Sequence, residues 1–315
     1  MEQLMIIGSG PAGLTAAIYA ARGFLNPLLI TGNELGGQIA TTTDVDNFPG
    51  FPNGVTGPEL YDQMQKQAER FGTRTVFDEV VAVDLLHHPF KIRTTSDEFE
   101  TKALIIATGA SPRKLGVPGE NEFLGRGVSY CATCDGFFFR NKEVMVVGGG
   151  DSALQEGLFL TKFANRVRII HRRESLRAGP SLQERMKKNE KMQVVWNSAI
   201  REIQGNGAVQ TVKLEDTRTG AQSETPVSGV FVYIGHEPNT GLFKDQLAMD
   251  HEGYLIADAR LHTSIPGVFA AGEVHDKVFR QAIASAGYGC MASMEAEKFL
   301  AELEHNGYPD ANRQP

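Results

Sequence analysis

Two glycine-rich turns, each between an apolar run and a helix-forming segment, constrain the fold of this chain most strongly. The first, Gly8-Ser9-Gly10-Pro11-Ala12-Gly13, follows apolar residues 3–7 and precedes an alanine-rich segment, residues 14–22. In a strand–turn–helix unit the first glycine permits a tight turn, the second lets the backbone approach a pyrophosphate, and the third allows close packing. Pro11 suits the first helical turn because it has no amide proton. The pattern predicts a nucleotide-binding α/β unit, with a glycine turn that binds nothing as the alternative.

The second turn, Gly148-Gly149-Gly150-Asp151-Ser152-Ala153, repeats this arrangement between apolar residues 142–147 and a helical segment, residues 154–163. The next predicted strand, residues 166–170, runs into His171-Arg172-Arg173, with Arg177 shortly after. The adenosine ribose of a dinucleotide lies at this strand end, where guanidinium groups would hold a 2'-phosphate and an acidic residue would favour NAD. The arginines therefore favour NADP, with a solvated basic turn as the alternative.

Cys131 and Cys134 form a Cys-x-x-Cys pair, and Asp135 follows it. Such a pair can cycle between dithiol and disulfide because its sulfurs can approach bonding distance and a lowered thiol pKa supplies the attacking thiolate. The adjacent carboxyl can donate or accept a proton as the pair is reduced. A zinc site would need four ligands, yet the only other cysteine is Cys290. An inert buried pair is the other alternative. With the two turns, the pair predicts flavin, dithiol and pyridine nucleotide in series, without a metal.

Further segments are candidates for contact with the flavin. Thr31-Gly32 occupies the position where a ribose-binding acid often follows the second strand. Gly36-Gly37-Gln38 and a segment containing Asn47 follow, and the glycines would let backbone amides meet a large planar cofactor, or form turns only. Near the C-terminus, Glu273 after Gly272 can accept a hydrogen bond from a ribityl hydroxyl. Arg280 would stabilise negative charge on a reduced flavin, unless it is an ordinary surface arginine.

Length and composition predict a two-domain chain. With 315 residues and 41% hydrophobic content, there is room for two cores. Proline and glycine cluster at residues 110–119 and 235–239, which predicts two linkers and an inserted domain. We place the first domain at residues 1–115 and 238–315 and the inserted one at 116–237.

Charge and hydropathy exclude several classes of partner. A net charge of -7 disfavours a nucleic-acid partner, because phosphate contacts need a basic face. The apolar stretch over residues 4–21 is broken by glycines and proline and lacks a basic leader, so neither a membrane span nor a signal peptide is expected. Three cysteines without an export signal predict a cytoplasmic protein.

These motifs, in this order, resemble the low-molecular-weight thioredoxin reductases over essentially the whole chain. The similar segments are Gly8 to Gly13, Gly36-Gly37-Gln38, Cys131-Ala132-Thr133-Cys134-Asp135-Gly136, Gly148 to Ala153, His171-Arg172-Arg173 with Arg177, and Arg280-Gln281-Ala282. The resemblance implies an α/β fold of two Rossmann-like domains, with an NADPH domain inserted into a split FAD domain, and a homodimer. It also explains Thr31, since Thr-Gly is common there in these reductases, and it adds Gln281, Ala282 and His236 to the expected cofactor contacts.

The resemblance further implies that NADPH reduces FAD, that FAD reduces the disulfide, and that the dithiol reduces thioredoxin. Cys134 would face the flavin, Cys131 would attack thioredoxin, and Asp135 would be the acid. Phe137 and Phe138 would dock thioredoxin, with core packing as the alternative. The two domains would alternate between two orientations about the linkers.

Two departures and three alternatives accompany this interpretation. Glu273 stands where the family has Asp, and Tyr288 where a smaller residue is commoner. The alternatives are a reductase of another disulfide protein, a dithiol oxidase, and a nucleotide-binding redox sensor without turnover. The arginine cluster disfavours the oxidase, and retention of both cysteines and Asp135 disfavours the sensor.

Overall fold

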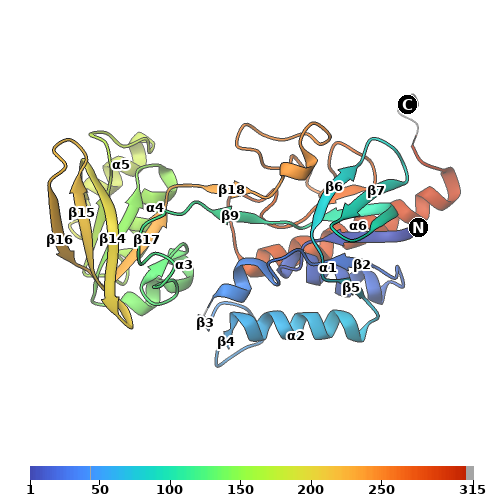
Figure 1. Ribbon diagram of the computed structural model, residues 1–315, viewed down its shortest axis with the longest axis horizontal. Helices are drawn as coiled ribbons and strands as arrows, with labels where there is room; N and C mark the ends of the chain where they lie inside the picture. The colour runs from blue at the N-terminus through green and yellow to red at the C-terminus, as the bar shows by residue number, and fades with distance from the viewer. Residues whose placement is uncertain (43, 310–315) are drawn as a thin grey trace. The chain divides into compact units, whose positions relative to one another are not determined.

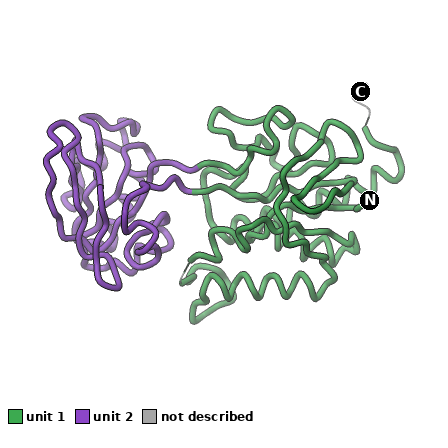
Figure 2. Tube along the Cα trace, in the orientation of Figure 1, with its two compact units in different colours: residues 1–111, 237–315 green, residues 112–236 purple. Residues whose placement is uncertain are grey.

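The computed structural model describes residues 1–42 and 44–309, which form two compact units (Figures 1 and 2). Unit 1 comprises Met1–Ser111 and Glu237–Pro315, and unit 2 comprises Pro112–His236. Unit 2 is therefore inserted into unit 1. The chain passes between units after Ser111 and after His236, whereas the sequence placed these boundaries after residues 115 and 237.

Unit 1 is built on a seven-stranded sheet whose central strands are parallel. The first strand, β1, aligns with β2 on one side and with β8 on the other. The parallel strands are β1 (Glu2–Ile7), β2 (Leu28–Ile30), β5 (Arg74–Val76), β8 (Glu98–Ile106) and β19 (Val268–Ala270). The hairpin of β6 (Val80–Asp84) and β7 (Phe90–Thr94) extends the sheet in the antiparallel sense.

Alternation along β1 sends side chains into two cores. Leu4 and Ile6 pack with the helices, whereas Met5 and Ile7 pack with the β6–β7 hairpin and the chain around residues 243–274. The helices are α1 (Pro11–Arg22), α2 (Gly57–Arg70) and α6 (Ala282–Asn306), and the shorter elements are η1 (Gly37–Thr41), β3 (Asp44–Val45), β4 (Val55–Thr56) and η3 (Gly241–Phe243).

Unit 2 repeats this layering around a five-stranded parallel sheet of order β10-β17-β11-β12-β13. Val144 and Val146 face the helices, and Met145 and Val147 face a three-stranded antiparallel sheet. The parallel strands are β10 (Val128–Ser129), β11 (Glu143–Gly148), β12 (Arg166–Ile170), β13 (Met192–Val195) and β17 (Gly229–Tyr233). The antiparallel strands are β14 (Ser198–Asn206), β15 (Ala208–Asp216) and β16 (Gln222–Pro226). The helices are α3 (Ala132–Asp135), η2 (Gly136–Phe139), α4 (Asp151–Leu160) and α5 (Pro180–Lys187).

The two connections between the units pair with each other. Strands β9 (Ala110–Pro112) and β18 (His236–Pro238) form a two-stranded sheet. On one side of it the Asn239 N–H donates to the Gly109 carbonyl over 3.0 Å, and on the other the Arg113 N–H donates to the Gly235 carbonyl, also over 3.0 Å. Both proline- and glycine-rich segments predicted as linkers contain these strands.

The predicted fold class is confirmed, because both strand–glycine turn–helix units are present and their strands, β1 and β11, pair in parallel with the neighbours on both sides. Gly207, with φ 74°, makes the turn between β14 and β15. Strand β8 begins at Glu98, and the last helix, α6, extends to Asn306. Within residues 1–42 and 44–309, none of the helices combines the length and apolarity that crossing a membrane requires.

Candidate active site

The first glycine turn has the geometry of a phosphate cradle. Gly8 has φ 108° and its N–H donates to the Ile30 carbonyl over 2.8 Å. A Cβ on Gly13 would lie 1.8 Å from the Gly8 carbonyl oxygen, so glycine is required for α1 to pack on the turn. At Gly10, the atom nearest to an added Cβ is 3.8 Å away, and no side chain caps α1. The backbone at Gly10 is therefore open to a ligand, which fits a pyrophosphate at the helix N-terminus.

Ser9 joins this turn to two neighbouring loops. The side chain is 2% exposed, donates to the Thr31 carbonyl over 3.2 Å and accepts the Gly36 N–H over 3.1 Å. The Thr31 hydroxyl donates to the Gly32 carbonyl, so the buried Thr31 side chain serves the loop itself. Sequence analysis missed Ser9 because it occupies a variable position of the motif.

Gln38 and Glu273 connect the Gly36 loop with the C-terminal segment. The Gln38 amide donates to the Ala110 carbonyl over 2.5 Å and to Glu273 Oε2 over 2.9 Å. Burial raises the pKa of Glu273, and the Gln38 hydrogen bond and the positive charge of Arg280 act in the opposite direction. Gly272, with φ 82°, lies where a Cβ would be 2.9 Å from Ala12 Cβ. The predicted Glu273 is thereby placed close to the first turn.

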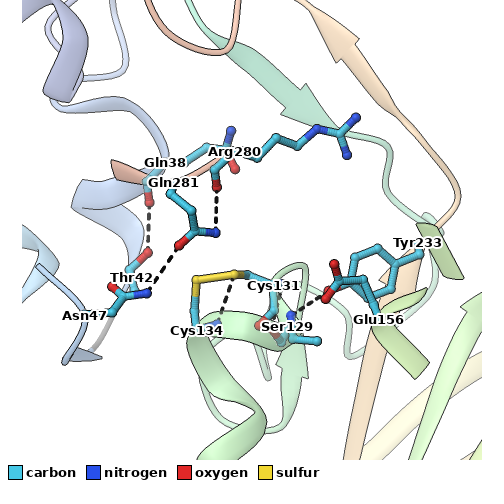
Figure 3. The surroundings of a disulfide bond; sticks show 11 residues. Gln38, Thr42, Asn47, Ser129, Cys131, Cys134, Glu156, Tyr233, Arg280 and Gln281 are labelled. Carbon is cyan, nitrogen blue, oxygen red and sulfur yellow. Dashed lines mark hydrogen bonds between the residues drawn. A yellow bond between two sulfur atoms is a disulfide. The ribbon is translucent and has the colours of Figure 1, made fainter. Parts of the chain in front are cut away.

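Asn47 meets the segment that begins α6. The Asn47 amide donates to Gln281 Oε1 over 3.3 Å, and the Gln281 amide donates to the Arg280 carbonyl over 3.0 Å, as Figure 3 shows. Arg280 has φ 50°, a left-handed conformation that turns the chain into the helix beginning at Ala282. Four segments predicted to contact a flavin therefore come together within unit 1.

Two buried polar atoms in unit 1 favour a ligand with polar groups. Tyr61 Oη and His275 Nε2 are among the buried side-chain atoms of the described residues that have no hydrogen-bond partner. The Tyr61 ring lies against Gly36, where a Cβ would be 2.7 Å from it, and the backbone N–H of His275 donates to the Gly272 carbonyl. Buried polar atoms are rarely unsatisfied, so the residues present fit a cofactor with hydroxyl, phosphate and ring nitrogen groups such as FAD.

The second glycine turn is held in the same way in unit 2. A Cβ on Gly148, φ 155°, would lie 2.4 Å from the Tyr233 carbonyl oxygen, whereas nothing lies within 4 Å of one on Gly150. Gly150 is the N-cap residue of α4, and no side chain caps this helix. Asp151 Oδ1 accepts the Gly179 N–H over 2.7 Å and so links α4 to α5, while Ala153 is buried and Ser152 is exposed.

The His171 side chain packs against this turn. The ring is 7% exposed, and Nδ1 and Nε2 lie 3.1 Å and 2.9 Å from the carbonyl oxygens of Gly148 and Ser175. A Cβ on Gly149 would be 2.3 Å from the ring. The side chain predicted to contact a cofactor thus also packs against the glycine turn.

The three arginines lie beside the second turn with exposed side chains. The Arg177 N–H donates to the Gly149 carbonyl over 2.7 Å, which fixes this segment to the turn. Across residues 1–42 and 44–309, no carboxylate pairs with Arg172, Arg173 or Arg177, whereas Arg168 on the preceding strand pairs with Glu143 over 2.7 Å. Unpaired guanidinium groups beside a nucleotide turn suit a 2'-phosphate.

Cys131 and Cys134 form a disulfide with their Cα atoms 5.3 Å apart, at the start of α3 (Figure 3). Cys131 Sγ accepts the Cys134 N–H over 3.1 Å, and the Cys131 carbonyl accepts the Asp135 N–H over 3.1 Å. Both cysteines and Asp135 are partly exposed. The pair is thus accessible, as a pair that exchanges with another disulfide must be.

Tyr233 and Glu156 contact this segment and were missed by sequence analysis. Tyr233 Oη accepts the Ala132 N–H over 2.5 Å and lies 3.5 Å from Glu156 Oε2. Phe137 and Phe138 follow Asp135, are 56% and 44% exposed, and have ring centroids 6.2 Å apart. The other predicted residue of unit 2, His236, begins β18.

Comparison with known proteins gives one family. Residues 2–289 match the family described as pyridine nucleotide-disulphide oxidoreductase. The chain is 55% identical to a thioredoxin reductase of Rickettsia bellii (strain RML369-C), covering 95% of this chain and 98% of that protein. It is 50% identical to one of Streptomyces coelicolor, covering 96% and 95%. The crystal structure of thioredoxin reductase from Streptococcus pyogenes MGAS5005 matches with a TM-score of 0.91 and 43% identity, covering 95% and 98%. The chain therefore belongs to the pyridine nucleotide-disulphide oxidoreductases, and within them to the thioredoxin reductases.

Proposed function

We propose that this protein is a thioredoxin-disulfide reductase that passes electrons from NADPH through FAD and the Cys131–Cys134 pair to thioredoxin. The observation that carries the proposal is the accessible disulfide in a unit that also holds a nucleotide turn. The relatives named thioredoxin reductase support the same activity. A reducing cytoplasm is the compartment in which such a dithiol persists.

Each unit is proposed to bind one cofactor. FAD, when bound, accepts a hydride from NADPH and delivers two electrons to a disulfide. In unit 1 the proposed FAD contacts are Gly8, Gly10, Pro11, Ala12, Gly13, Thr31, Gly32, Gly36, Gly37, Gln38, Asn47, Gly272, Glu273, Arg280, Gln281 and Ala282. In unit 2 the proposed NADPH contacts are Gly148, Gly150, Asp151, Ser152, Ala153, His171, Arg172, Arg173 and Arg177, with His236 at the connection between units.

The dithiol chemistry follows from the positions of the two sulfurs. Two electrons and two protons convert the disulfide to two thiols, and Asp135 is proposed to hold and transfer a proton beside them. The Cys131 thiolate attacks thioredoxin's disulfide and forms a mixed disulfide. The Cys134 thiolate then attacks Cys131 Sγ, which releases reduced thioredoxin and restores the disulfide. The disulfide must be reduced by the flavin and then meet thioredoxin, so the two units are proposed to alternate between two orientations. This change of orientation is proposed to occur at β9 and β18.

Two exposed apolar surfaces support the proposed protein partners. Phe137 and Phe138 are exposed on η2, which directly follows α3, and would contact thioredoxin. A second apolar surface lies on α1 and α6 of unit 1, which pack together. Its members are Tyr19 on α1, Phe24 just after α1, and Ile283, Met291 and Met294 on α6, which are 43%, 94%, 46%, 40% and 49% exposed. Exposed apolar groups of this kind mark interaction surfaces, and we propose that a second copy of the chain covers this one.

Stopped-flow absorbance of the flavin tests the proposal. The purified yellow protein is mixed with NADPH or NADH, with and without an oxidised thioredoxin. Fast bleaching by NADPH followed by thioredoxin-dependent recovery is expected. Bleaching without recovery would favour another disulfide protein as partner, and recovery driven by oxygen alone would favour an oxidase. No bleaching with either nucleotide would contradict the reductase assignment and leave the redox sensor.

A further inference from the structure

Tyr233 places a buried hydroxyl against the helix that carries the dithiol. The residue ends β17 and is 9% exposed. Tyr233 Oη accepts the Ala132 N–H over 2.5 Å and donates toward Glu156 Oε2 over 3.5 Å. Figure 3 shows the Tyr233 and Glu156 side chains together beside the cysteines. One phenol thus contacts α3 through its oxygen and α4 through its proton.

The backbone around Ala132 determines where the two sulfurs lie. Ala132 is the first residue of α3, so its N–H has no partner within the helix and needs another acceptor. The preceding residue, Cys131, accepts two further hydrogen bonds from this turn. Its Sγ accepts the Cys134 N–H and its carbonyl oxygen accepts the Asp135 N–H, each over 3.1 Å. A shift of the Ala132 peptide would therefore move both cysteines.

The Tyr233 hydroxyl stays protonated, as its hydrogen bond to Glu156 requires. Burial raises the pKa of Tyr233 well above its ordinary value, and the negative charges of Glu156 and Asp135 raise it further. The phenol remains neutral at physiological pH, so it donates to a carboxylate while its oxygen accepts from Ala132.

We propose that Tyr233 is a positioning residue for the Cys131–Cys134 pair, whose hydroxyl fixes the first turn of α3 in the geometry of the disulfide. Its role in thioredoxin reduction rests on the function proposed above. The hydrogen bond from the Ala132 N–H to Tyr233 Oη is seen with the disulfide closed. Opening the disulfide frees Cys131 and Cys134 to move apart, and such a movement would shift the Ala132 peptide and weaken this hydrogen bond. The hydroxyl therefore stabilises the disulfide over the dithiol.

Tyr233→Phe tests this with little change in packing, because the ring and the backbone against Gly148 are retained. The flavin-containing protein is equilibrated in dithiothreitol redox buffers and quenched with an alkylating agent, and the fraction of reduced Cys131 and Cys134 is read by mass spectrometry. Loss of one hydrogen bond should shift the equilibrium about fivefold toward the dithiol. Tyr308→Phe is the matched control, because Tyr308 donates to the Pro266 carbonyl in unit 1.

An equilibrium equal to wild type in Tyr233→Phe, or an equal shift in Tyr308→Phe, would overturn the assignment. If Tyr233→Phe does not fold, Glu156→Gln takes its place, with a smaller shift in the same direction expected and an unchanged equilibrium counting against it. The measurement uses neither NADPH nor thioredoxin. Failure of the wild type to reduce thioredoxin would refute the proposed function and leave this result standing.

Discussion

The exposed guanidinium groups at the end of β12 should decide between NADPH and NADH. Replacing Arg172 and Arg173 with Ala would remove the proposed charge-assisted hydrogen bonds to the 2'-phosphate, so the KM for NADPH should rise about tenfold or more for each side chain. The KM for NADH should change little. Steady-state kinetics with both nucleotides measures this, and Arg166→Ala is the control because Arg166, at the start of β12, pairs with Glu143 on β11. Equal rises for both nucleotides would contradict the assignment.

Cys134 should be required for thioredoxin reduction and dispensable for reduction of the flavin. In Cys134→Ser the disulfide cannot form, so thioredoxin-dependent NADPH oxidation should fall to background. NADPH should still reduce an artificial acceptor such as ferricyanide, because that reaction bypasses the pair. Cys290→Ser, which removes the free cysteine, should retain both reactions. Persistent thioredoxin reduction in Cys134→Ser would refute the dithiol mechanism.

Asp78 should make the stability of unit 1 depend on acid pH. Hydrogen bonds from the Thr95 and Thr94 hydroxyls, and from the N–H groups of Glu79 and Ser96, hold the pKa of Asp78 well below its usual range. The native state therefore binds fewer protons than the unfolded state. The stabilisation is present above the unfolded pKa of about 3.9 and is lost as the pH falls toward the native pKa.

Asp78→Asn should accordingly lower Tm at pH 7, with the difference from wild type shrinking below about pH 3. Thermal unfolding followed by circular dichroism at pH 7 and below about pH 3 measures the difference in Tm between the variant and the wild type. Asp62→Asn, at an exposed ion pair with Lys66, is the control and should have little effect at either pH. A gap that stays constant with pH would show that the Asp78 carboxylate is not responsible.

At the scale of elements, the close crossing of α1 and α6 depends on one glycine. A Cβ on Gly289 would lie 2.1 Å from the Ala12 carbonyl oxygen, whereas nothing lies within 4 Å of one on Gly287. Gly289→Ala should destabilise the protein by about 1–3 kcal/mol through overpacking. Gly287→Ala should be neutral or stabilising by up to about 1 kcal/mol, since alanine favours a helix.

Thermal unfolding of the two variants measures this contrast on a single helix. Because Ala12 belongs to the first glycine turn, the Gly289 variant should also retain less flavin during purification. Equal melting temperatures for Gly287→Ala and Gly289→Ala would show that the helices separate without cost.

The elements that carry glycine turns could be predicted from sequence because the spacing of their glycines encodes both the turn and the packing. Gly13 and Gly148 illustrate this, since an added Cβ would strike the turn carbonyl or Tyr233. Helix α2 was not predicted, although Thr56 and Glu59 form a capping box that the sequence displays. The β6–β7 hairpin was missed as well, because no Asn-Gly or Asp-Gly turn joins its strands.

Site residues could be predicted from the sequence only where they belong to a recognisable local motif. Ser9, Tyr233 and Glu156 act through contacts between segments distant in sequence, and no local pattern distinguishes them. His171 shows the opposite limit, because its motif predicted a cofactor contact and gave no sign of the packing against Gly149.

At the scale of the whole molecule, each of the two connections between the units lies near a tyrosine that adjoins or contacts the segment with the disulfide. Glu120 is 2% exposed and accepts the N–H groups of Leu115 and Gly116, each over 2.8 Å, and the hydroxyl of Tyr130 over 2.9 Å. Tyr130 immediately precedes Cys131. On the second connection, Tyr233 lies two residues before Gly235. The segments that enter and leave unit 2 are therefore anchored to the residues that hold the disulfide.

The apolar surface on α1 and α6 should mediate the proposed dimer. Met291→Glu with Met294→Glu would place charges in an apolar interface, where unpaired charges are costly, and should weaken association by about a hundredfold or more. Sedimentation velocity at micromolar concentration should show a dimer for the wild type and a monomer for the double variant. Phe77→Glu, at a 61% exposed position elsewhere in unit 1, is the control and should remain dimeric. A monomeric wild type, or a double variant that sediments as a dimer, would exclude this surface as the interface.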